Sequence, residues 1–252
     1  DQLKDRAIPA LRAAPPKGGQ LRAWTPGCST GEEAYSLAMV FKEALEQVKP
    51  ARNFLLQVFA TDLDRDAIDR ARAGAYPANV AADISAERLR RFFVQEEHGY
   101  RVNKEIRETV IFAPQNVIMD PPFTKLDLLV CRNLLIYLDQ GVQKKLISLF
   151  HYSLNPSGIL FLGSSETIGS HNDLFSPLRG KTRLYRRTDA FSREELVEFP
   201  SSFSADLPGT SSTLVKERPP VPNLQNLADQ ALLQRFSPAA VLTNDKGDIL
   251  YI

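Results

Sequence analysis

Residues 21–33 read LRAWTPGCSTGEE. An apolar run ends at Pro26, a turn rich in small residues follows, and a helix begins at Glu32. Apolar residues then recur at steps of three and four, as one buried face of a helix requires: Ala34, Leu37, Ala38, Phe41, Leu45 and Val48. A strand, a tight turn and a helix in this order predict a doubly wound, Rossmann-like α/β sheet with a nucleotide-type cofactor site at the turn.

A second strand is predicted over residues 54–60, FLLQVFA, which is almost continuously apolar. Such a run is typical of a parallel sheet that is covered on both faces. Asp62 follows directly, and a carboxylate at this point can accept hydrogen bonds from two neighbouring ribose hydroxyls. The turn and this acid together predict a pocket for a ribose-bearing ligand.

The turn differs from the dinucleotide fingerprint, because Gly27, Ser29 and Gly31 are followed at once by Glu32 and Glu33. Two carboxylates at a helix start repel a pyrophosphate and attract a cation. Among ribose-bearing cofactors this favours S-adenosylmethionine, which has no phosphate and carries a sulfonium and an ammonium group. The alternative is that both acids only complement the helix dipole.

The composition indicates a soluble globular protein of 252 residues, with 43% apolar and 24% charged residues. The formal charge of +1 gives no reason to expect nucleic acid as a partner. Two cysteines far apart suggest no disulfide framework, so a cytoplasmic location is expected. No apolar run approaches a membrane span, so we expect no membrane insertion. The three histidines fall on different predicted elements, so we expect no metal site.

Several helices are predicted along the first half of the chain. Residues 1–14 already have a helical pattern, so we expect the sequence to begin inside a longer polypeptide. A helix over residues 65–73 follows Asp64 as its N-cap and closes at Gly74. A further helix has its apolar face at Leu89, Phe92 and Phe93. Its arginines, Arg88, Arg90 and Arg91, are expected to be solvated or to face an acidic partner.

An inserted antiparallel hairpin is predicted at about residues 98–114, where polar and apolar residues alternate. It is either a substrate-docking surface beside the cofactor site or an edge extension of the sheet. Further on, we predict strands over residues 126–131, 159–163 and 182–187, a helix over 140–154 and a turn over 156–158. Five or six strands can be counted in total.

The expected domain organisation has three parts. Residues 1–188 form the α/β domain, and residues 189–222, where apolar periodicity disappears, form a linker. Residues 223–252 contain a helix over 224–236 and two strands around Asp245 to Asp248. Because a lone hairpin is marginally stable, this tail is interpreted as the start of a truncated domain.

Residues 3–187 resemble the CheR family of chemotaxis-receptor, protein-glutamate O-methyltransferases. Four stretches carry the resemblance, and together they are highly specific: PGCSTGEEAYSLA, FATDLDRDAIDRARAG, CRNLLIYLD and PSGILFLGSSE. The tail resembles the start of a PAS sensor domain. The stretch DPPFTKLDLLVCRNLLIYL and this tail resemble stretches of fusion proteins that join methylesterase, methyltransferase and PAS modules. The chain is therefore expected to be a fragment of such a protein.

The resemblance implies roles for particular residues. Glu32 or Glu33 contacts the methionine part of S-adenosylmethionine, Asp62 its ribose and Asn116 its adenine side. Arg132, Asn133 and Tyr137 match the segment that lines the methyl-transfer site. The full cofactor set is Gly27, Ser29, Thr30, Gly31, Glu32, Glu33, Asp62, Asn116, Val117, Arg132 and Asn133, and the catalytic pair is Tyr137 and Arg132.

The implied reaction methylates glutamate side chains in the cytoplasmic part of a methyl-accepting receptor, with S-adenosylhomocysteine as the other product. Other domains of the same fusion chain are the further expected partners. The carboxylate is already a nucleophile at neutral pH, so the site has to supply in-line placement. We expect Tyr137 to orient the incoming carboxylate and Arg132 to offset its charge; the alternatives are a core aromatic and a structural ion pair.

Two departures and two rival functions accompany the resemblance. The family's upstream threonine and arginine motif is not in this sequence, and QEEHGY replaces a glycine-rich loop that some relatives use to grip a receptor peptide. One rival is an N-methyltransferase that uses Asp120-Pro121-Pro122-Phe123. That tetrapeptide precedes the strand over residues 126–131, whereas in such enzymes it follows the strand. The other rival is a non-catalytic regulatory module that binds S-adenosylmethionine.

Overall fold

The computed structural model describes residues 3–13, 19–48, 55–178, 183–189, 242–243 and 249–251. The chain divides into two compact units, Asp1–Phe203 and Ser204–Ile252. In the second unit, β11 (Leu242–Thr243) and β12 (Ile249–Tyr251) pair antiparallel, which confirms the two predicted strands. The predicted helix over 224–236 and linker residues 190–222 lie outside the described residues. Within the described ranges, no helix is both long and apolar enough to cross a bilayer.

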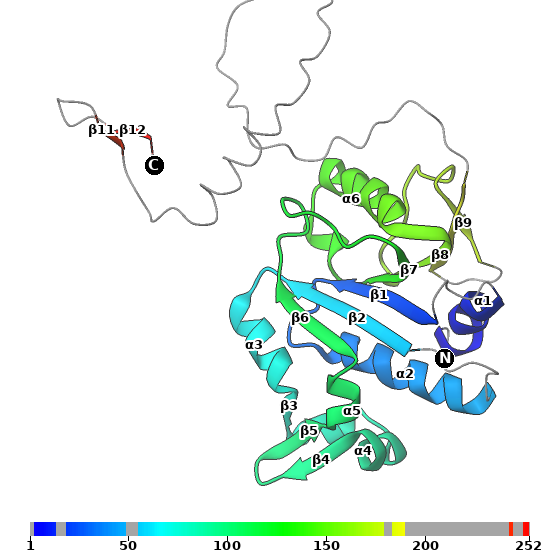
Figure 1. Ribbon diagram of the computed structural model, residues 1–252, viewed down its shortest axis with the longest axis vertical. Helices are drawn as coiled ribbons and strands as arrows, with labels where there is room; N and C mark the ends of the chain where they lie inside the picture. The colour runs from blue at the N-terminus through cyan, green and yellow to red at the C-terminus, as the bar shows by residue number, and fades with distance from the viewer. Residues whose placement is uncertain are drawn as a thin grey trace, which may run out of the picture. The chain divides into compact units, whose positions relative to one another are not determined.

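Seven strands form the main sheet of the first unit, in the order β6-β2-β1-β7-β8-β10-β9 (Figure 1). The pairs β1–β2, β1–β7, β2–β6 and β7–β8 are parallel, whereas β10 pairs antiparallel with β8 and β9. This confirms the predicted doubly wound sheet. The strands are β1 (Gln20–Pro26), β2 (Leu55–Asp62), β6 (Val110–Pro114), β7 (Leu126–Cys131), β8 (Leu154–Leu162), β9 (Phe175–Pro177) and β10 (Leu184–Arg187).

Helices cover both faces of this sheet. The helical segments of the unit are Leu3–Ala7, α1 (Ile8–Ala13), α2 (Glu32–Val48), α3 (Arg65–Ala73), Ala78–Ala82, α4 (Ala86–Phe92), α5 (Lys104–Arg107), Leu135–Tyr137 and α6 (Gln140–Ser153). Neighbouring strand residues point to opposite faces, so Ala23 packs with α1 and α2 in one apolar cluster and Trp24 packs with α6 in another. Every residue of β7 is buried, as expected for a central strand.

A small antiparallel sheet is inserted between α3 and β6, in the order β3-β5-β4 (Figure 1). Its strands are β3 (Ala75–Pro77), β4 (Phe93–Glu96) and β5 (Gly99–Val102). The predicted hairpin over 98–114 is therefore wrong in its bounds, because Val110–Pro114 is β6 and pairs parallel with β2. The alternation is broken at Asn103, whose side chain accepts the N–H of Ile106 and starts α5.

Ion pairs hold this insertion against the second half of α2. Arg88 on α4 donates to Glu43, with Nε 2.6 Å from Oε1, and Arg91 pairs with Glu46. Lys42 pairs with Glu105 on α5. Arg88 and Arg91 are thus paired within the chain, which corrects the expectation that they are solvated or face a partner.

The end of the sheet also departs from the prediction. The predicted turn over 156–158 lies inside β8, which begins at Leu154. Proline is tolerated there because β10 pairs only with Ile159 to Phe161, so the first half of β8 has β7 on one side alone. Phe175–Pro177 forms β9, a seventh strand. Three residues are too few to show a strand pattern in the sequence.

Candidate functional site

The predicted site residues gather at the carboxyl edge of the sheet. The chain leaves β1 toward β2 and β6 on one side, and β7 leads to β8 on the other, so the strand order reverses between β1 and β7. Open α/β sheets bind ligands at such a reversal. All twelve residues predicted from the sequence lie in, or directly beside, the segments that follow β1, β2, β6 and β7.

The turn after β1 has a backbone conformation that its sequence explains. Gly27 and Gly31 have φ of +70° and +92°, and Ser29 has φ of 47°. A Cβ on Gly31 would approach the Ala71 side chain to 2.9 Å and the Phe112 ring to 3.0 Å, so only glycine fits. The Cys28 N–H donates to Thr61 O at 3.0 Å, which ties the turn to the end of β2.

Asp62 is half-buried at the last position of β2 and lies against the turn. Its Oδ2 accepts the Ser29 N–H at 2.7 Å, and its Oδ1 accepts the Asp64 N–H at 3.0 Å. A carboxylate offers about four lone-pair positions, so two remain for further donors. This arrangement fits a ribose with two neighbouring hydroxyls.

The acids at the start of α2 have different neighbours. Glu32 is exposed and accepts the Thr30 hydroxyl at 2.7 Å. Glu33 pairs with Arg132 across the strand reversal, with Oε1 3.0 Å from Nη1. Burial raises the pKa of Glu33, and the hydrogen bond from Arg132 opposes this effect. The side of the site formed by the turn after β1 therefore carries carboxylates, which suit a cationic ligand.

Tyr76 connects the small sheet to the turn. Its hydroxyl donates to Thr30 O at 2.8 Å. Burial raises the pKa of Tyr76, and the nearby Glu32 raises it further. The phenol therefore stays protonated and remains a donor at neutral pH.

The segment after β6 contains Asn116 and Val117. The Asn116 side-chain oxygen accepts the Ile118 N–H at 3.0 Å. This leaves the side-chain NH₂ group to donate hydrogen bonds to a ligand. Val117 is half-buried against the apolar cluster on the α6 face.

The Asp-Pro-Pro-Phe tetrapeptide has structural partners here. Asp120 Oδ2 accepts the Asn116 N–H at 2.7 Å. The Phe123 ring stacks on Phe59 with centroids 4.4 Å apart and meets Trp24 edge-on at 5.6 Å. The tetrapeptide lies between β6 and β7, not after β7, so its position does not favour the N-methyltransferase alternative.

The segment after β7 brings three predicted residues together. Arg132 and Asn133 are exposed, and Asn133 has φ of 58°. Tyr137 exposes 78% of its surface at the end of the short helix Leu135–Tyr137.

Glu166 is a buried acid that the sequence pattern does not single out. It is only 4% exposed and accepts the backbone N–H groups of Leu134 and Leu135 in that segment. The stretch PSGILFLGSSE contains Glu166, which lies four residues beyond the end of β8.

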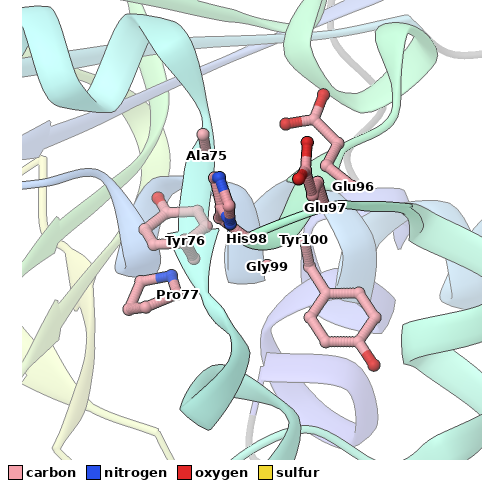
Figure 2. A pocket seen from close by; sticks show the side chains of 8 residues that line it. All are labelled: Ala75, Tyr76, Pro77, Glu96, Glu97, His98, Gly99 and Tyr100. Atoms are coloured by element: carbon pink, nitrogen blue, oxygen red, sulfur yellow. The ribbon is translucent and has the colours of Figure 1, made fainter.

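A separate pocket of about 370 Å³ lies on the small sheet (Figure 2). Its lining residues come from β3, β4, β5 and the turn between β4 and β5: Ala75, Tyr76, Pro77, Glu96, Glu97, His98, Gly99 and Tyr100. None of these is among the residues predicted for cofactor or catalysis. The hydrogen bond from the Tyr76 hydroxyl to Thr30 O links this pocket to the turn after β1.

A family model and two named relatives indicate the same family. The family described as "CheR methyltransferase, SAM binding domain" matches residues 1–184. A 104.1 kDa protein of Rhodobacter capsulatus is 41% identical over 185 residues, which cover 73% of this chain and 19% of that protein. The chemotaxis protein methyltransferase of Escherichia coli is 35% identical over 66% of this chain and 58% of its own length. Chemotaxis protein methyltransferase 1 of Pseudomonas aeruginosa is 37% identical over 68% and 63%. The chain thus spans less than two thirds of these three relatives.

Among solved structures, a TehB-like SAM-dependent methyltransferase from Corynebacterium glutamicum covers 71% of this chain and 84% of its own. It is 14% identical with a TM-score of 0.40.

Proposed function

Because the chain belongs to the CheR methyltransferase family, whose matched domain binds S-adenosylmethionine, we propose that it methylates glutamate carboxylates of a chemotaxis-type receptor. The products are glutamyl methyl esters, which serve signal adaptation, and S-adenosylhomocysteine. One observation carries the proposal: the acidic turn with Asp62 and the Arg132–Tyr137 segment face the same strand reversal.

The proposed cofactor contacts follow the loops. Asp62 accepts the ribose hydroxyls through its two remaining lone-pair positions, and Glu32 or Glu33 attracts the ammonium group. Asn116 and Val117 lie on the adenine side. Gly27, Ser29, Thr30 and Gly31 bring the backbone close, and Arg132 and Asn133 complete the contact set.

In the proposed reaction, bound S-adenosylmethionine supplies a methyl group activated by its sulfonium. A glutamate oxygen would form the new O–C bond as the C–S bond breaks, so no base would have to remove a proton. In-line placement can account for roughly 7 to 11 kcal/mol of the barrier. Tyr137 is proposed to orient the carboxylate through its exposed hydroxyl. Arg132 is proposed to offset the carboxylate's charge while it stays beside Glu33.

The proposal includes a cytoplasmic location and fusion to further signalling domains. Both cysteines, Cys28 and Cys131, are buried free thiols, which agrees with a reducing compartment. We assign residues 1–188 to the methyltransferase domain, 189–222 to a linker and 223–252 to the start of a PAS-like domain.

The decisive experiment incubates the chain with methyl-labelled S-adenosylmethionine and cytoplasmic receptor fragments, followed by mild base. A carboxyl methyl ester releases volatile labelled methanol, and this is the expected result. Base-stable label would indicate N-methylation. Absence of transferred label, with cofactor binding intact, would indicate a regulatory binding module.

A first prediction tests the ribose contact. Asp62→Ala is expected to weaken S-adenosylhomocysteine binding by roughly 10- to 100-fold, because charge-assisted hydrogen bonds contribute about 1.5 to 3 kcal/mol each. Isothermal calorimetry measures the dissociation constant. The matched control is Asp64→Ala, which removes the N-cap of α3 and should lower stability without changing binding. Equal binding by Asp62→Ala and the unsubstituted chain would remove Asp62 from the site.

A further inference from the structure

Glu166 is a buried acid with no assigned part in the reaction. Glu166 and Asp127 are the acidic residues that the described part of the chain buries, with 4% and 9% exposed. Burying a carboxylate is costly unless hydrogen bonds compensate it. The hydrogen-bond donors to Glu166 therefore show which segments its carboxylate connects.

All three donors to the Glu166 carboxylate are backbone N–H groups. Oε1 accepts Leu134 N at 3.0 Å and Leu135 N at 2.9 Å, and Oε2 accepts Gly163 N at 2.8 Å. Leu134 and Leu135 follow β7, whereas Gly163 follows β8. One side chain thus fixes the segment that carries Arg132, Asn133 and Tyr137 to the end of the neighbouring strand.

The segment after β7 needs such a support because it turns sharply. Asn133 has φ of 58°, a left-handed conformation that asparagine tolerates better than most residues. The turn points the next two N–H groups at the Glu166 carboxylate. Without that acceptor, the buried Leu135 N–H and the partly buried Leu134 N–H would be unsatisfied and the segment would have to rearrange.

Position 163 is matched to the same carboxylate. A Cβ on Gly163 would lie 2.5 Å from Glu166 Oε2 and 3.5 Å from the Arg132 Cα. A Cβ there would therefore push the carboxylate aside, although Gly163 has no positive φ. Glu166 also lies near Glu33, where its charge adds to burial in raising the Glu33 pKa. Glu33 thus lies close enough to feel the charges of both Arg132 and Glu166.

We propose that Glu166 is a positioning residue for methyl transfer, which acts through the Arg132–Tyr137 segment and touches neither substrate nor cofactor. This inference rests on the proposed function. Its hydrogen bonds set where the Arg132 guanidinium and the Tyr137 hydroxyl stand relative to the turn after β1. They also set the position of Asn133, a proposed cofactor contact.

The chain offers a matched control for a merely structural role. Asp127 accepts the Arg22 N–H at 2.9 Å and the Asn155 amide at 2.9 Å. It lies near the start of β7, whereas the proposed site lies beyond that strand's end. Glu166→Gln and Asp127→Asn each turn a buried acceptor carboxylate into an amide of nearly the same shape.

The test compares kinetics, binding and stability of the two variants, at a temperature where circular dichroism shows both folded. For Glu166→Gln we expect kcat to fall roughly 10- to 100-fold, as for a small misplacement of reacting groups. The KM for the receptor fragment should change much less. Calorimetry should show weaker S-adenosylhomocysteine binding, and the Leu134 and Leu135 amides should exchange hydrogen faster. Asp127→Asn should lose stability and keep the kinetics of the unsubstituted chain.

Specific outcomes overturn the inference. Glu166→Gln with reduced stability but unchanged kcat and unchanged binding would make Glu166 only structural, as would an equal kinetic loss in Asp127→Asn. If Glu166→Gln does not fold, Gly163→Ala decides, since its Cβ displaces the carboxylate without removing it; normal kinetics there would refute the inference. If the unsubstituted chain forms no methyl ester, the proposed function fails, and calorimetry and hydrogen exchange still decide whether Glu166 positions the segment.

Discussion

Tyr137 can be tested in isolation because 78% of its surface is exposed and the fold does not depend on its hydroxyl. Tyr137→Phe is expected to lower kcat by roughly 10- to 100-fold, since the carboxylate loses its orienting donor, with little change in thermal stability. Methanol release from labelled ester measures the rate. Tyr152→Phe, a partly exposed tyrosine on α6, is the control and should keep full activity. Unchanged turnover in Tyr137→Phe would refute the orienting role.

Cys28 illustrates how the acidic turn affects a neighbouring group. Burial, with the charge of Asp62 as a second cause, raises the pKa of the Cys28 thiol to about 12. Only the thiolate is reactive, so the folded chain should resist alkylation by iodoacetamide at about pH 8, where a free cysteine reacts. Mass spectrometry of native and urea-unfolded samples measures the labelling. Rapid modification of Cys28 in the native sample would contradict the expectation.

At the scale of elements, the sequence predicted those whose pattern is local. The apolar stripe of α2, the buried run of β7 and the Asp64 and Gly74 caps of α3 all lie where expected. The hairpin bounds failed because Ile106 keeps the strand alternation while it sits in α5. β9 was missed because three residues carry too little pattern.

The same distinction applies to the site. The turn after β1 and Asp62 could be predicted, because each stands at the end of a recognisable apolar run. The groups that would contact a ligand are visible in the local sequence. Glu166 could not, because it acts on backbone N–H groups 31 and 32 residues earlier in the chain. Likewise, the sequence does not reveal that Arg132 pairs with Glu33, 99 residues away.

The pairing of α4 with α2 gives a prediction for stability. The hydrogen bond from Arg88 lowers the pKa of Glu43 below its ordinary 4.5. A lowered carboxyl pKa stabilises the fold above the unfolded value, and this contribution is lost as the pH falls through the folded value. Arg88→Met should therefore lower the free energy of unfolding at about pH 7 by less than about 1 kcal/mol, since the pair is partly exposed.

This difference should disappear in acid, below the folded pKa of Glu43. Urea unfolding at both pH values measures it, and Arg90→Met, an exposed arginine on the same helix, is the control. A loss that is the same in acid and at neutral pH would assign the Arg88 effect to packing of its aliphatic stem instead.

For the whole molecule, the proposed site belongs entirely to the first compact unit, Asp1–Phe203. A chain that ends at Phe203 is therefore expected to bind S-adenosylhomocysteine as tightly as the full 252 residues. Calorimetry on both chains measures this, with thermal unfolding of each as the control for folding. Weaker binding by the shorter chain would mean that residues 204–252 contribute to the site.

The central position of β1 has a consequence for how the chain is made. Its partner β7 arrives late, since Arg22 and Asp127, which join the two strands, are 105 residues apart in the sequence. Contacts this distant slow folding, because a long loop has to close before they form. While the ribosome is still translating toward Leu126, one side of β1 exposes unpaired backbone groups to any neighbouring nascent chain. A mutation that delays β7 should therefore cause aggregation during synthesis before any effect on the folded chain can be measured.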